Sequence, residues 1–361
     1  MANRRVIFVT VGALALVLLF LSFTFRSVPQ PIIEIKGETI VEFGPLPVRN
    51  TLLTSWCIVL FIVVLAWFSG RNLKWEPKGW QNFVETVIEG IRTIVVNTAG
   101  EVNGKRFFWV VATIMLYITI SNWSALLPVF NAIGKVEEVT PHHFHEEAIV
   151  VKTSGIAFIN LGAEVIELEV DETVCEGLAD EGRERCIEEA RAEAIAHAKE
   201  EHGVGEGEKL AIMAPYFRSV NTDLMSPLSL SLVAFAFIEF WGFSSQGVFA
   251  YTTKFFNFPR LFRGGFMGLI DFFVGILEFI AELARLISFT FRLFGNMLAG
   301  EILLLVMTFL LPYMFFILSV FYGLEIFVGV VQAFVFGMLV LVFGMLAVTV
   351  HGQGQGDDSH E

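Results

Sequence analysis

The sequence predicts an all-α polytopic membrane protein with five to six membrane helices, the last two long and antiparallel, plus an amphipathic helix at the membrane interface. Hydrophobic residues make up 55% of the chain, whereas soluble domains contain roughly 45–50%. Several apolar runs reach the about 17–25 residues that a helix needs to cross a bilayer. The acidic residues are concentrated: residues 135–212 hold 20 of the 37 acidic residues and 7 of the 24 basic ones, so this segment carries the whole net charge of −13.

These changes in composition divide the chain into five segments. They are an N-terminal anchor or signal with an external segment (1–50), membrane helices with a cytoplasmic interfacial helix (51–134), an acidic external insert (135–212), a second membrane segment (213–351) and a cytoplasmic tail (352–361).

The first apolar run covers about residues 6–24 and follows Arg4 and Arg5. It has the basic start and apolar centre of a signal peptide, but no small-x-small cleavage site follows it, which favours a retained anchor. Further runs lie at about 51–68, 108–130 and 226–250. Basic residues gather in the loops after the second and fourth runs, and the positive-inside rule makes those loops cytoplasmic. The insert is then external and the C-terminal tail is cytoplasmic.

The stretch between the second and third runs predicts an amphipathic helix. Phe83, Val87 and Ile91 recur at helical spacing, and Glu85 and Glu89 lie between them. Such a pattern is typical of a helix that lies in the membrane surface with its apolar side buried.

The acidic insert contains a charged, alanine-rich stretch that predicts a solvated helix with a break near Gly177 or Gly182. Cys175 and Cys186 could form a disulfide if the insert faces an oxidising compartment, and otherwise they remain free thiols. Three histidines at 141–147 lack the spacing of a known metal site. We therefore expect no metal and no cofactor.

The apolar region from 265 to 350 is too long for one helix, and Pro312 divides it in two because proline lacks the amide donor. The first part holds Arg292 and Glu301, and the second holds Glu325 and Gln332. Ionised side chains are costly inside a membrane and therefore usually face water, a partner or an ion pathway. These residues are the candidate functional site.

In an antiparallel pair of helices, Glu301 is expected level with Glu325, and Arg292 level with Gln332. Two carboxylates at one level in a low dielectric cannot both stay ionised, so the pair suits a proton relay. Arg292 keeps its charge at any physiological pH and suits attraction of a carboxylate on a partner. The structural alternative is an internal ion pair between Arg292 and one glutamate.

At this point the residues match a family. The stretch ISFTFRLFGNMLAGE at 287–301 closely resembles the signature of subunit a of the F-type ATP synthase, and EIFVGVVQAFVFGML at 325–339 resembles the family's final helix. Weaker likeness extends through SNWSALLP at 121–128 and RSVNTDLMSPLSLSL at 218–232. The resemblance implies that the last two helices are strongly tilted against a ring of c subunits.

The resemblance also implies roles for single residues. The family's essential arginine falls on Arg292, and the polar channel positions fall on Asn296, Glu301 and Gln332. Glu325 stands where some members have histidine, so this chain would pass its proton between two carboxylates. The function implied is coupling of proton flow through two half-channels to rotation of the c ring and ATP synthesis.

On the cytoplasmic side, Glu278 matches a family acid near the inner half-channel, and Arg285 stands where some members have lysine. Glu282 lies one turn from Glu278, so the three residues would form a charged strip. A salt bridge at the interface explains this strip as well as a channel mouth does.

The resemblance implies a non-catalytic subunit in the bacterial inner membrane. Its expected partners are the c-subunit ring, the peripheral-stalk b subunits, the other ATP synthase subunits and the lipid bilayer; nucleic acid is not expected. Two alternatives remain: a secondary transporter that binds a substrate with its intramembrane charges, and a passive assembly protein. The coupling ion, H⁺ or Na⁺, stays open at this stage.

Overall fold

The computed structural model describes residues 39–43, 46–71, 73–127, 130, 133–141, 144, 147–151, 156–158, 165–168, 170, 175, 180–204, 209–247, 251, 265–310 and 315–349. Several predictions fall outside these residues: the first apolar run, most of the histidine-containing loop at 141–147, the basic residues at 254–263, Pro312, and the tail at 352–361.

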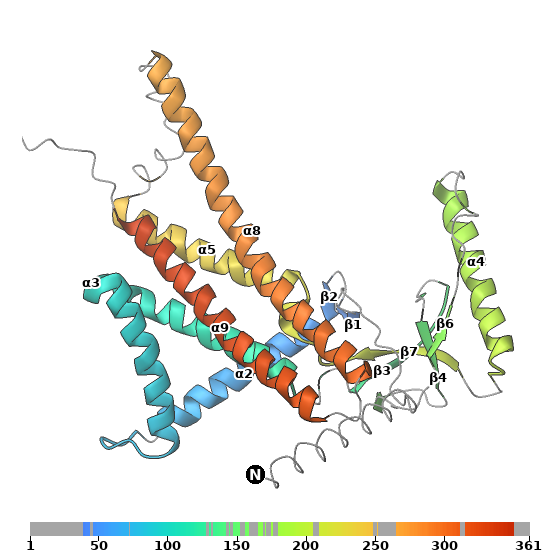
Figure 1. Ribbon diagram of the computed structural model, residues 1–361. Helices are drawn as coiled ribbons and strands as arrows, with labels where there is room; N and C mark the ends of the chain where they lie inside the picture. The colour runs from blue at the N-terminus through green and yellow to red at the C-terminus, as the bar shows by residue number, and fades with distance from the viewer. Residues whose placement is uncertain are drawn as a thin grey trace, which may run out of the picture. The chain divides into compact units, whose positions relative to one another are not determined.

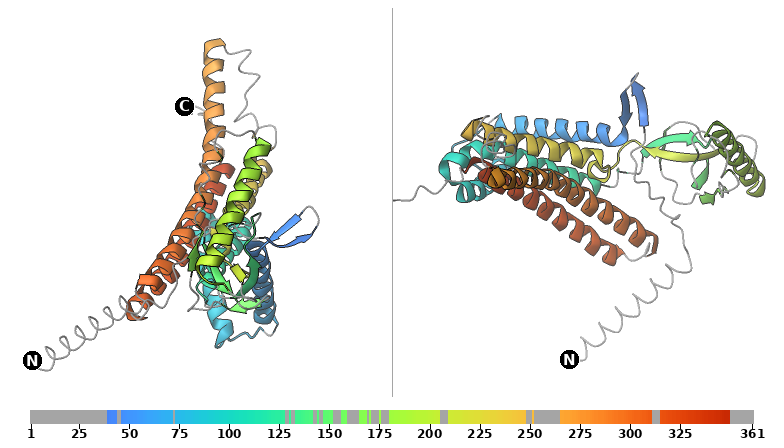
Figure 2. Two further views of the ribbon diagram at one scale, coloured as in Figure 1. Left: turned by 90° about the vertical axis from the view of Figure 1, so that its right-hand side faces the viewer. Right: turned by 90° about the horizontal axis from the view of Figure 1, so that it is seen from above.

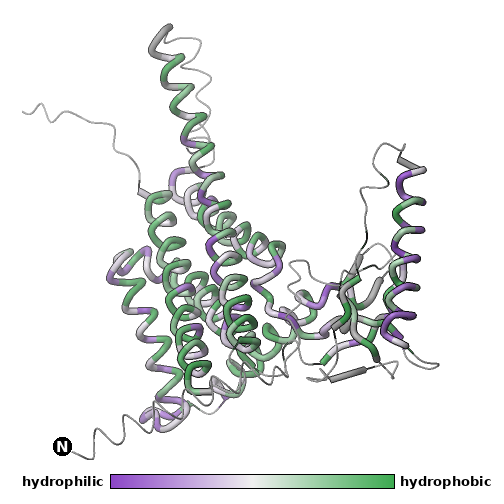
Figure 3. The backbone as a smooth tube through the Cα atoms, turned by 45° about the vertical axis from the view of Figure 1, so that its right-hand side comes forward, coloured by the Kyte–Doolittle hydropathy of each residue, from purple (hydrophilic) through white to green (hydrophobic). Residues whose placement is uncertain are grey.

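Six α-helices lie in the described residues (Figure 1): α2 (Asn50–Gly70), α3 (Trp80–Ala125), α4 (Asp180–Glu201), α5 (Met225–Gln246), α8 (Gly265–Leu310) and α9 (Phe315–Val348). Five of them, all except α4, are long and apolar enough to cross a membrane. A helix satisfies its backbone hydrogen bonds within itself, which is why an apolar run adopts this structure in lipid. The predicted all-α membrane fold is confirmed, and the hydropathy colouring in Figure 3 shows these helices as mainly hydrophobic.

Helix α3 combines the predicted interfacial helix and the third span. The two halves meet at Gly100, whose φ of 74° and ψ of 169° are not helical. Positive φ values are readily available only to glycine, so this residue allows the chain to change direction. In the first half, Ile91, Val95 and Ala99 are buried at a spacing of four residues. Val87 packs against the same core, whereas Phe83 is 58% exposed, so the predicted apolar side is buried from Val87 onward and not at Phe83.

The described chain divides into two compact units. The first contains Met1–Ser55, Ser124–Val220 and Leu298–Ile326, and the second contains Trp56–Trp123, Asn221–Met297 and Phe327–Glu361. Helices α8 and α9 each contribute one part to each unit.

The core of the second unit is built from α3, α5, α8 and α9. Phe289 of α8 packs on Phe336 and Phe343 of α9, with ring centroids 5.2 and 5.8 Å apart. Glycines on α9 permit close helix approach, because a Cβ added to Gly337 would clash with Met115 of α3. This core holds the parts of α8 and α9 that carry Arg292, Asn296 and Gln332.

The acidic insert of the first unit contains a β-sheet that the sequence did not predict. Its five antiparallel strands are β3 (Ile133–Glu138), β4 (Glu147–Val151), β5 (Ile156–Phe158), β6 (Val165–Glu167) and β7 (Lys209–Pro215), in the order β5-β3-β7-β4-β6. β3 and β7 are neighbours, and Gly134 pairs with Pro215. The insert therefore begins and ends side by side. A separate hairpin, β1 (Thr39–Phe43) and β2 (Leu46–Arg49), precedes α2.

The charged helix α4 packs on this sheet through a small apolar face. Both views of Figure 2 show the helix beside the strands. Ile195 and Ala198 of α4 lie in one buried cluster with Ile166 and Leu210 of the strands. The expected break near Gly182 does not divide α4, because the helix begins at Asp180 and continues through that residue. A disulfide joins Cys175 to Cys186 in α4, with Cα atoms 5.8 Å apart.

Candidate functional site

The polar residues of α8 and α9 meet in the second unit through an amide pair. Asn296 Nδ2 donates a hydrogen bond to Gln332 Oε1 over 2.7 Å. Gln332 is 4% exposed, and its Nε2 atom is buried without a hydrogen-bond partner in the described part of the chain. Phe289 of α8 contacts Phe343 of α9, and Asn296, further along α8, contacts Gln332, which comes earlier in α9. The two helices are therefore antiparallel, as predicted (Figures 1 and 2).

The level predicted for Gln332 is shifted by one helical turn. The sequence placed it opposite Arg292, whereas its hydrogen-bond partner is Asn296, four residues further along α8. The prediction followed from residue spacing along each helix, but side-chain packing sets the register. One turn of helix is about 5.4 Å, which an arginine or glutamine side chain can span.

Arg292 lies half-buried on α8, beside the buried stripe of Phe289, Leu293 and Met297. It forms no ion pair with any residue that the structure describes. The alternative of an internal Arg292–glutamate pair is therefore not seen within those residues. Glu301 is nine residues further on, about half a turn round a straight helix from Arg292. The arginine and this carboxylate consequently project from different sides of α8.

Glu325 of α9 is buried against α8 in the first unit. It is 7% exposed, and a Cβ added to Gly300 would meet its carboxyl carbon and Oε1, each at 2.6 Å. A side chain at position 300 would therefore require the Glu325 carboxyl group to move. Glu301, the next residue of α8, is half-buried and its Oε2 atom is fully buried. The structure thus places Glu325 at the level of residues 300–301, the level at which the sequence expected it.

Two members of the predicted charged strip form an ion pair on α8. Arg285 Nη1 lies 3.0 Å from Glu282 Oε1, and Glu282 is 5% exposed. The Arg285 guanidinium also lies 4.5 Å from the ring centroid of Phe343 on α9. Glu278 is half-buried one turn away. The Glu282 side chain is thus buried, whereas 32% of the Arg285 side chain remains exposed.

Sequence reasoning missed a tyrosine and a glutamate near this strip. Tyr251 is 1% exposed and packs against Gly242 of α5, where a Cβ would clash with the ring. Burial raises the pKa of the Tyr251 hydroxyl above its ordinary range, and the charges of Glu239 and Glu282 and a hydrogen bond to Glu239 act in the same direction. The sequence signal that could have identified this site was Glu239, a glutamate inside the apolar run 226–250.

Sequence reasoning also missed a buried amide cluster at the other end of the bundle. Asn221 Nδ2 lies 2.9 Å from Ser121 Oγ and 2.6 Å from Asn122 Oδ1, and Asn122 Nδ2 donates to the Gly329 carbonyl over 3.4 Å. All three polar side chains are at most 1% exposed. The signal was the pair Ser121-Asn122 inside an apolar run, but its partner lies 99 residues further along the chain.

Comparison with known proteins gives one family. The family described as ATP synthase A chain matches residues 52–344. "ATP synthase subunit a" of Desulfosudis oleivorans is 25% identical over 288 residues, which cover 80% of this chain and 83% of the relative. The same-named protein of Trichlorobacter lovleyi is 38% identical over 81 residues, which cover 22% of this chain and 35% of the relative. The same-named protein of Geotalea uraniireducens is 35% identical over 112 residues, which cover 31% of this chain and 44% of the relative. The chain thus spans less than half the length of these last two relatives.

Proposed function

Because this chain belongs to the ATP synthase A chain family, we propose that it forms the two proton half-channels of a rotary ATP synthase and presents Arg292 to the carboxylates of the c ring. Its general place is the membrane sector of the complex, which translocates protons and is not itself catalytic. The chain is accordingly an integral membrane protein with five helices of spanning character in its described residues.

The observation that carries the proposal is the hydrogen bond between Asn296 and Gln332, one helical turn from Arg292. It fixes a polar level in otherwise apolar helices, and Gln332 Nε2 remains a buried donor at that level. A buried donor is costly unless a water or carboxylate accepts from it. Arg292 has no carboxylate partner in the described residues, so a ring carboxylate can become its counter-ion. That encounter favours release of the ring proton by stabilising the anion.

The external half-channel contains Glu301 and Glu325 as the proton relay. The Glu325 carboxyl group packs against Gly300 of α8. Glu301 is the residue that follows Gly300 in the chain. A buried carboxyl group exchanges protons readily with a second one at the same level, because only one of the two can remain ionised. The amide cluster of Ser121, Asn122 and Asn221 offers further polar atoms for ordered water in the second unit.

The cytoplasmic half-channel contains Glu278, Glu282 and Arg285, together with Glu239. Glu282 is paired with Arg285 at 3.0 Å, and we assign proton exchange to Glu278 and to Glu239, which accepts a hydrogen bond from Tyr251. The proposed partners are the c ring, the peripheral-stalk b subunits and the remaining ATP synthase subunits. The proposed location is the bacterial inner membrane, with the acidic insert external and the C-terminus cytoplasmic.

The test is proton flux in vesicles that hold the purified complex. We expect Glu325→Gln to lower passive and ATP-driven flux by about a hundredfold, the scale of a lost proton-transfer group. Glu89→Gln is the control, because Glu89 is exposed on the first half of α3 and should leave both fluxes at the parent rate. Unchanged flux in Glu325→Gln would exclude the relay. A strict sodium requirement would exclude protons as the coupling ion.

A further inference from the structure

The two halves of α3 cross closely at the bend formed by Gly100. A Cβ added to Gly104 would lie 3.0 Å from the Val96 Cα atom and 3.2 Å from its Cγ2 atom. Residue 104 must therefore be small for the first half to pack on the start of the second. This crossing brings together side chains that the sequence separates by a full bend of the chain.

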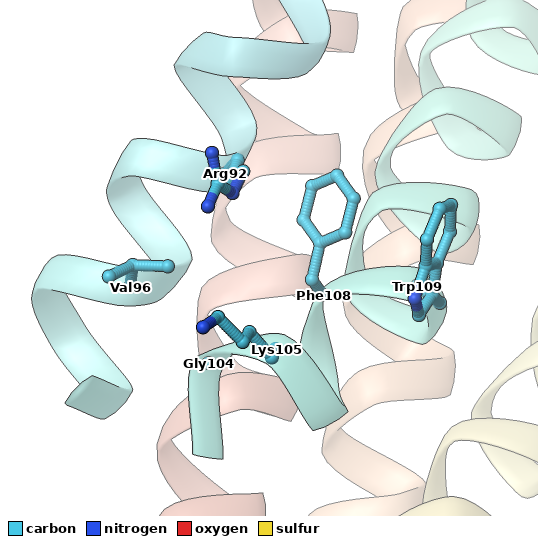
Figure 4. A pocket seen from close by; sticks show the side chains of 6 residues that line it. All are labelled: Arg92, Val96, Gly104, Lys105, Phe108 and Trp109. Atoms are coloured by element: carbon cyan, nitrogen blue, oxygen red, sulfur yellow. The ribbon is translucent and has the colours of Figure 1, made fainter. Parts of the chain in front are cut away.

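A cavity of about 280 Å³ lies at this crossing and is lined by Arg92, Val96, Gly104, Lys105, Phe108 and Trp109. Figure 4 shows that Arg92 and Val96 come from the first half of α3, whereas Lys105, Phe108 and Trp109 come from the second half. Two cationic side chains from different helices thus share one cavity. The remaining side chains that line it are apolar or aromatic.

The charge balance of the cavity favours an anion. Arg92 is exposed and forms no ion pair with a described residue. Lys105 Nζ lies 3.3 Å from Glu101, but the two side chains are 67% and 69% exposed, so this pair is weak. Lysine has three donors, and arginine has five in a planar fork that fits phosphate oxygens. The site can hold one phosphate group between Arg92 and Lys105.

The apolar side of the cavity identifies the source of that phosphate. Trp109 is 73% exposed and Val102 is 84% exposed, although both lie where an amphipathic helix meets a membrane span. Tryptophan and basic residues at such a position are typical of the membrane interface. A soluble phosphate would leave the exposed tryptophan without a contact, whereas the glycerol and upper acyl chain of a lipid would cover it.

We propose that this cavity binds the headgroup of an anionic phospholipid in the cytoplasmic leaflet. The phosphate lies between Arg92 and Lys105, and the acyl chain runs along Trp109. A zwitterionic headgroup would bring its own cation toward the two basic residues and is disfavoured. The site is separate from the proton pathway proposed above and does not depend on it.

The proposal is tested on the purified full chain in detergent by native mass spectrometry with phosphatidylglycerol or phosphatidylcholine added. The parent chain should retain one molecule of phosphatidylglycerol under conditions in which it does not retain phosphatidylcholine. Arg92→Gln and Lys105→Gln should each weaken that binding by about fivefold, because one basic residue near an anionic surface contributes about fivefold in affinity. The two substitutions together should weaken it by about 30-fold. Lys74→Gln is the control: Lys74 is an exposed cation of the loop before α3 that does not line the cavity, so its binding should equal that of the parent.

Two further measurements keep the result interpretable. Arg92→Lys retains the charge and should bind more tightly than Arg92→Gln, which a general effect of substitution on folding would not produce. Inorganic phosphate should not compete with phosphatidylglycerol at millimolar concentration; full competition would identify a soluble anion as the ligand. Equal retention of the two lipids, or unchanged binding in the double variant, would overturn the proposal.

Discussion

Asn296 of α8 and Gln332 of α9 are joined by a hydrogen bond of 2.7 Å, one helical turn from Arg292. Gln332 is almost fully buried; its Oε1 atom accepts this bond, and its Nε2 atom has no hydrogen-bond partner among the described residues. The pair therefore has two separable consequences: it stabilises the packing of α8 on α9, and it keeps a polar group inside the membrane.

The first prediction separates these consequences. Asn296→Leu leaves the Gln332 amide buried without a partner and should destabilise the chain by about 1–3 kcal/mol. Asn296→Leu/Gln332→Leu replaces both partners by apolar groups and should recover most of that loss, as thermal unfolding of the purified complex will measure. Proton flux should stay low in the double variant, because the polar level is gone.

Thr308→Ala is the control for this series, since the Thr308 hydroxyl donates to Leu304 O within α8 and makes no hydrogen bond to α9 among the described residues. If the double variant were as unstable as Asn296→Leu, or more so, the result would contradict the pairing. Parent-level proton flux in the stable double variant would show that the Asn296–Gln332 pair is not part of the proton pathway.

The second prediction concerns the space at Gly300. A methyl group there would collide with the carboxyl group of Glu325, and this flexible side chain is the part that can move. Gly300→Ala should therefore displace the carboxyl group and lower proton flux, with little change in assembly. Gly295→Ala is a matched control on the same helix, because a Cβ at that position meets nothing within 4 Å.

Both alanines raise helix propensity by about 1 kcal/mol relative to glycine. A difference in flux between the two variants is therefore attributable to Glu325. Equal flux in Gly300→Ala and Gly295→Ala would show that the position of the Glu325 carboxyl group is unimportant.

The helices could be predicted because each depends on residues close in sequence. An apolar run of sufficient length adopts a helix in lipid whatever its neighbours are, so α2, α5, α8 and α9 follow from the sequence. The sheet of the insert depends on distant residues. β4 pairs with β7, and Ile149 of β4 lies opposite Ala211 of β7. Strands of three to seven residues in an acidic segment carry no pattern that identifies such partners.

The site shows the same division between local and distant information. Arg292, Glu301, Glu325 and Gln332 could be identified because charged and amide side chains are conspicuous in apolar runs. The pairing of Gln332 with Asn296 could not, because the packing of aromatic residues such as Phe289 on Phe336 sets the register. Tyr251 could not be assigned either, since its contact with Gly242 depends on the fold of the chain after α5.

The third prediction is that the insert is not needed for proton translocation. β3 and β7 are adjacent antiparallel strands, and Glu138 pairs with Ala211. Residues 139–210 can therefore be replaced by Asn-Gly, which suits a two-residue hairpin turn. The complex should keep ATP-driven proton pumping near the parent rate, measured by vesicle acidification. Loss of pumping in a fully assembled deletion complex would contradict this.

The fourth prediction concerns Arg292. A fixed positive charge between two half-channels stabilises the anion of an arriving ring carboxylate, and it stops protons from passing directly from one half-channel to the other. Lysine keeps a charge, but its ammonium is compact, strongly hydrated and able to lose its proton when buried. Arg292→Lys should therefore abolish ATP-coupled pumping in a complex that still assembles.

Arg292→Ala removes the charge itself, so it should also let protons leak passively down an imposed gradient. Gln332→Arg in this background should partly restore the barrier, because Gln332 lies on the facing helix one turn from the level of Arg292. Passive and ATP-driven acidification of vesicles distinguish the three variants. Since Arg292 has no ion pair in the described residues, a loss of pumping cannot be assigned to a broken internal pair there. Coupled pumping near the parent rate in Arg292→Ala would exclude this residue as the charge that faces the ring.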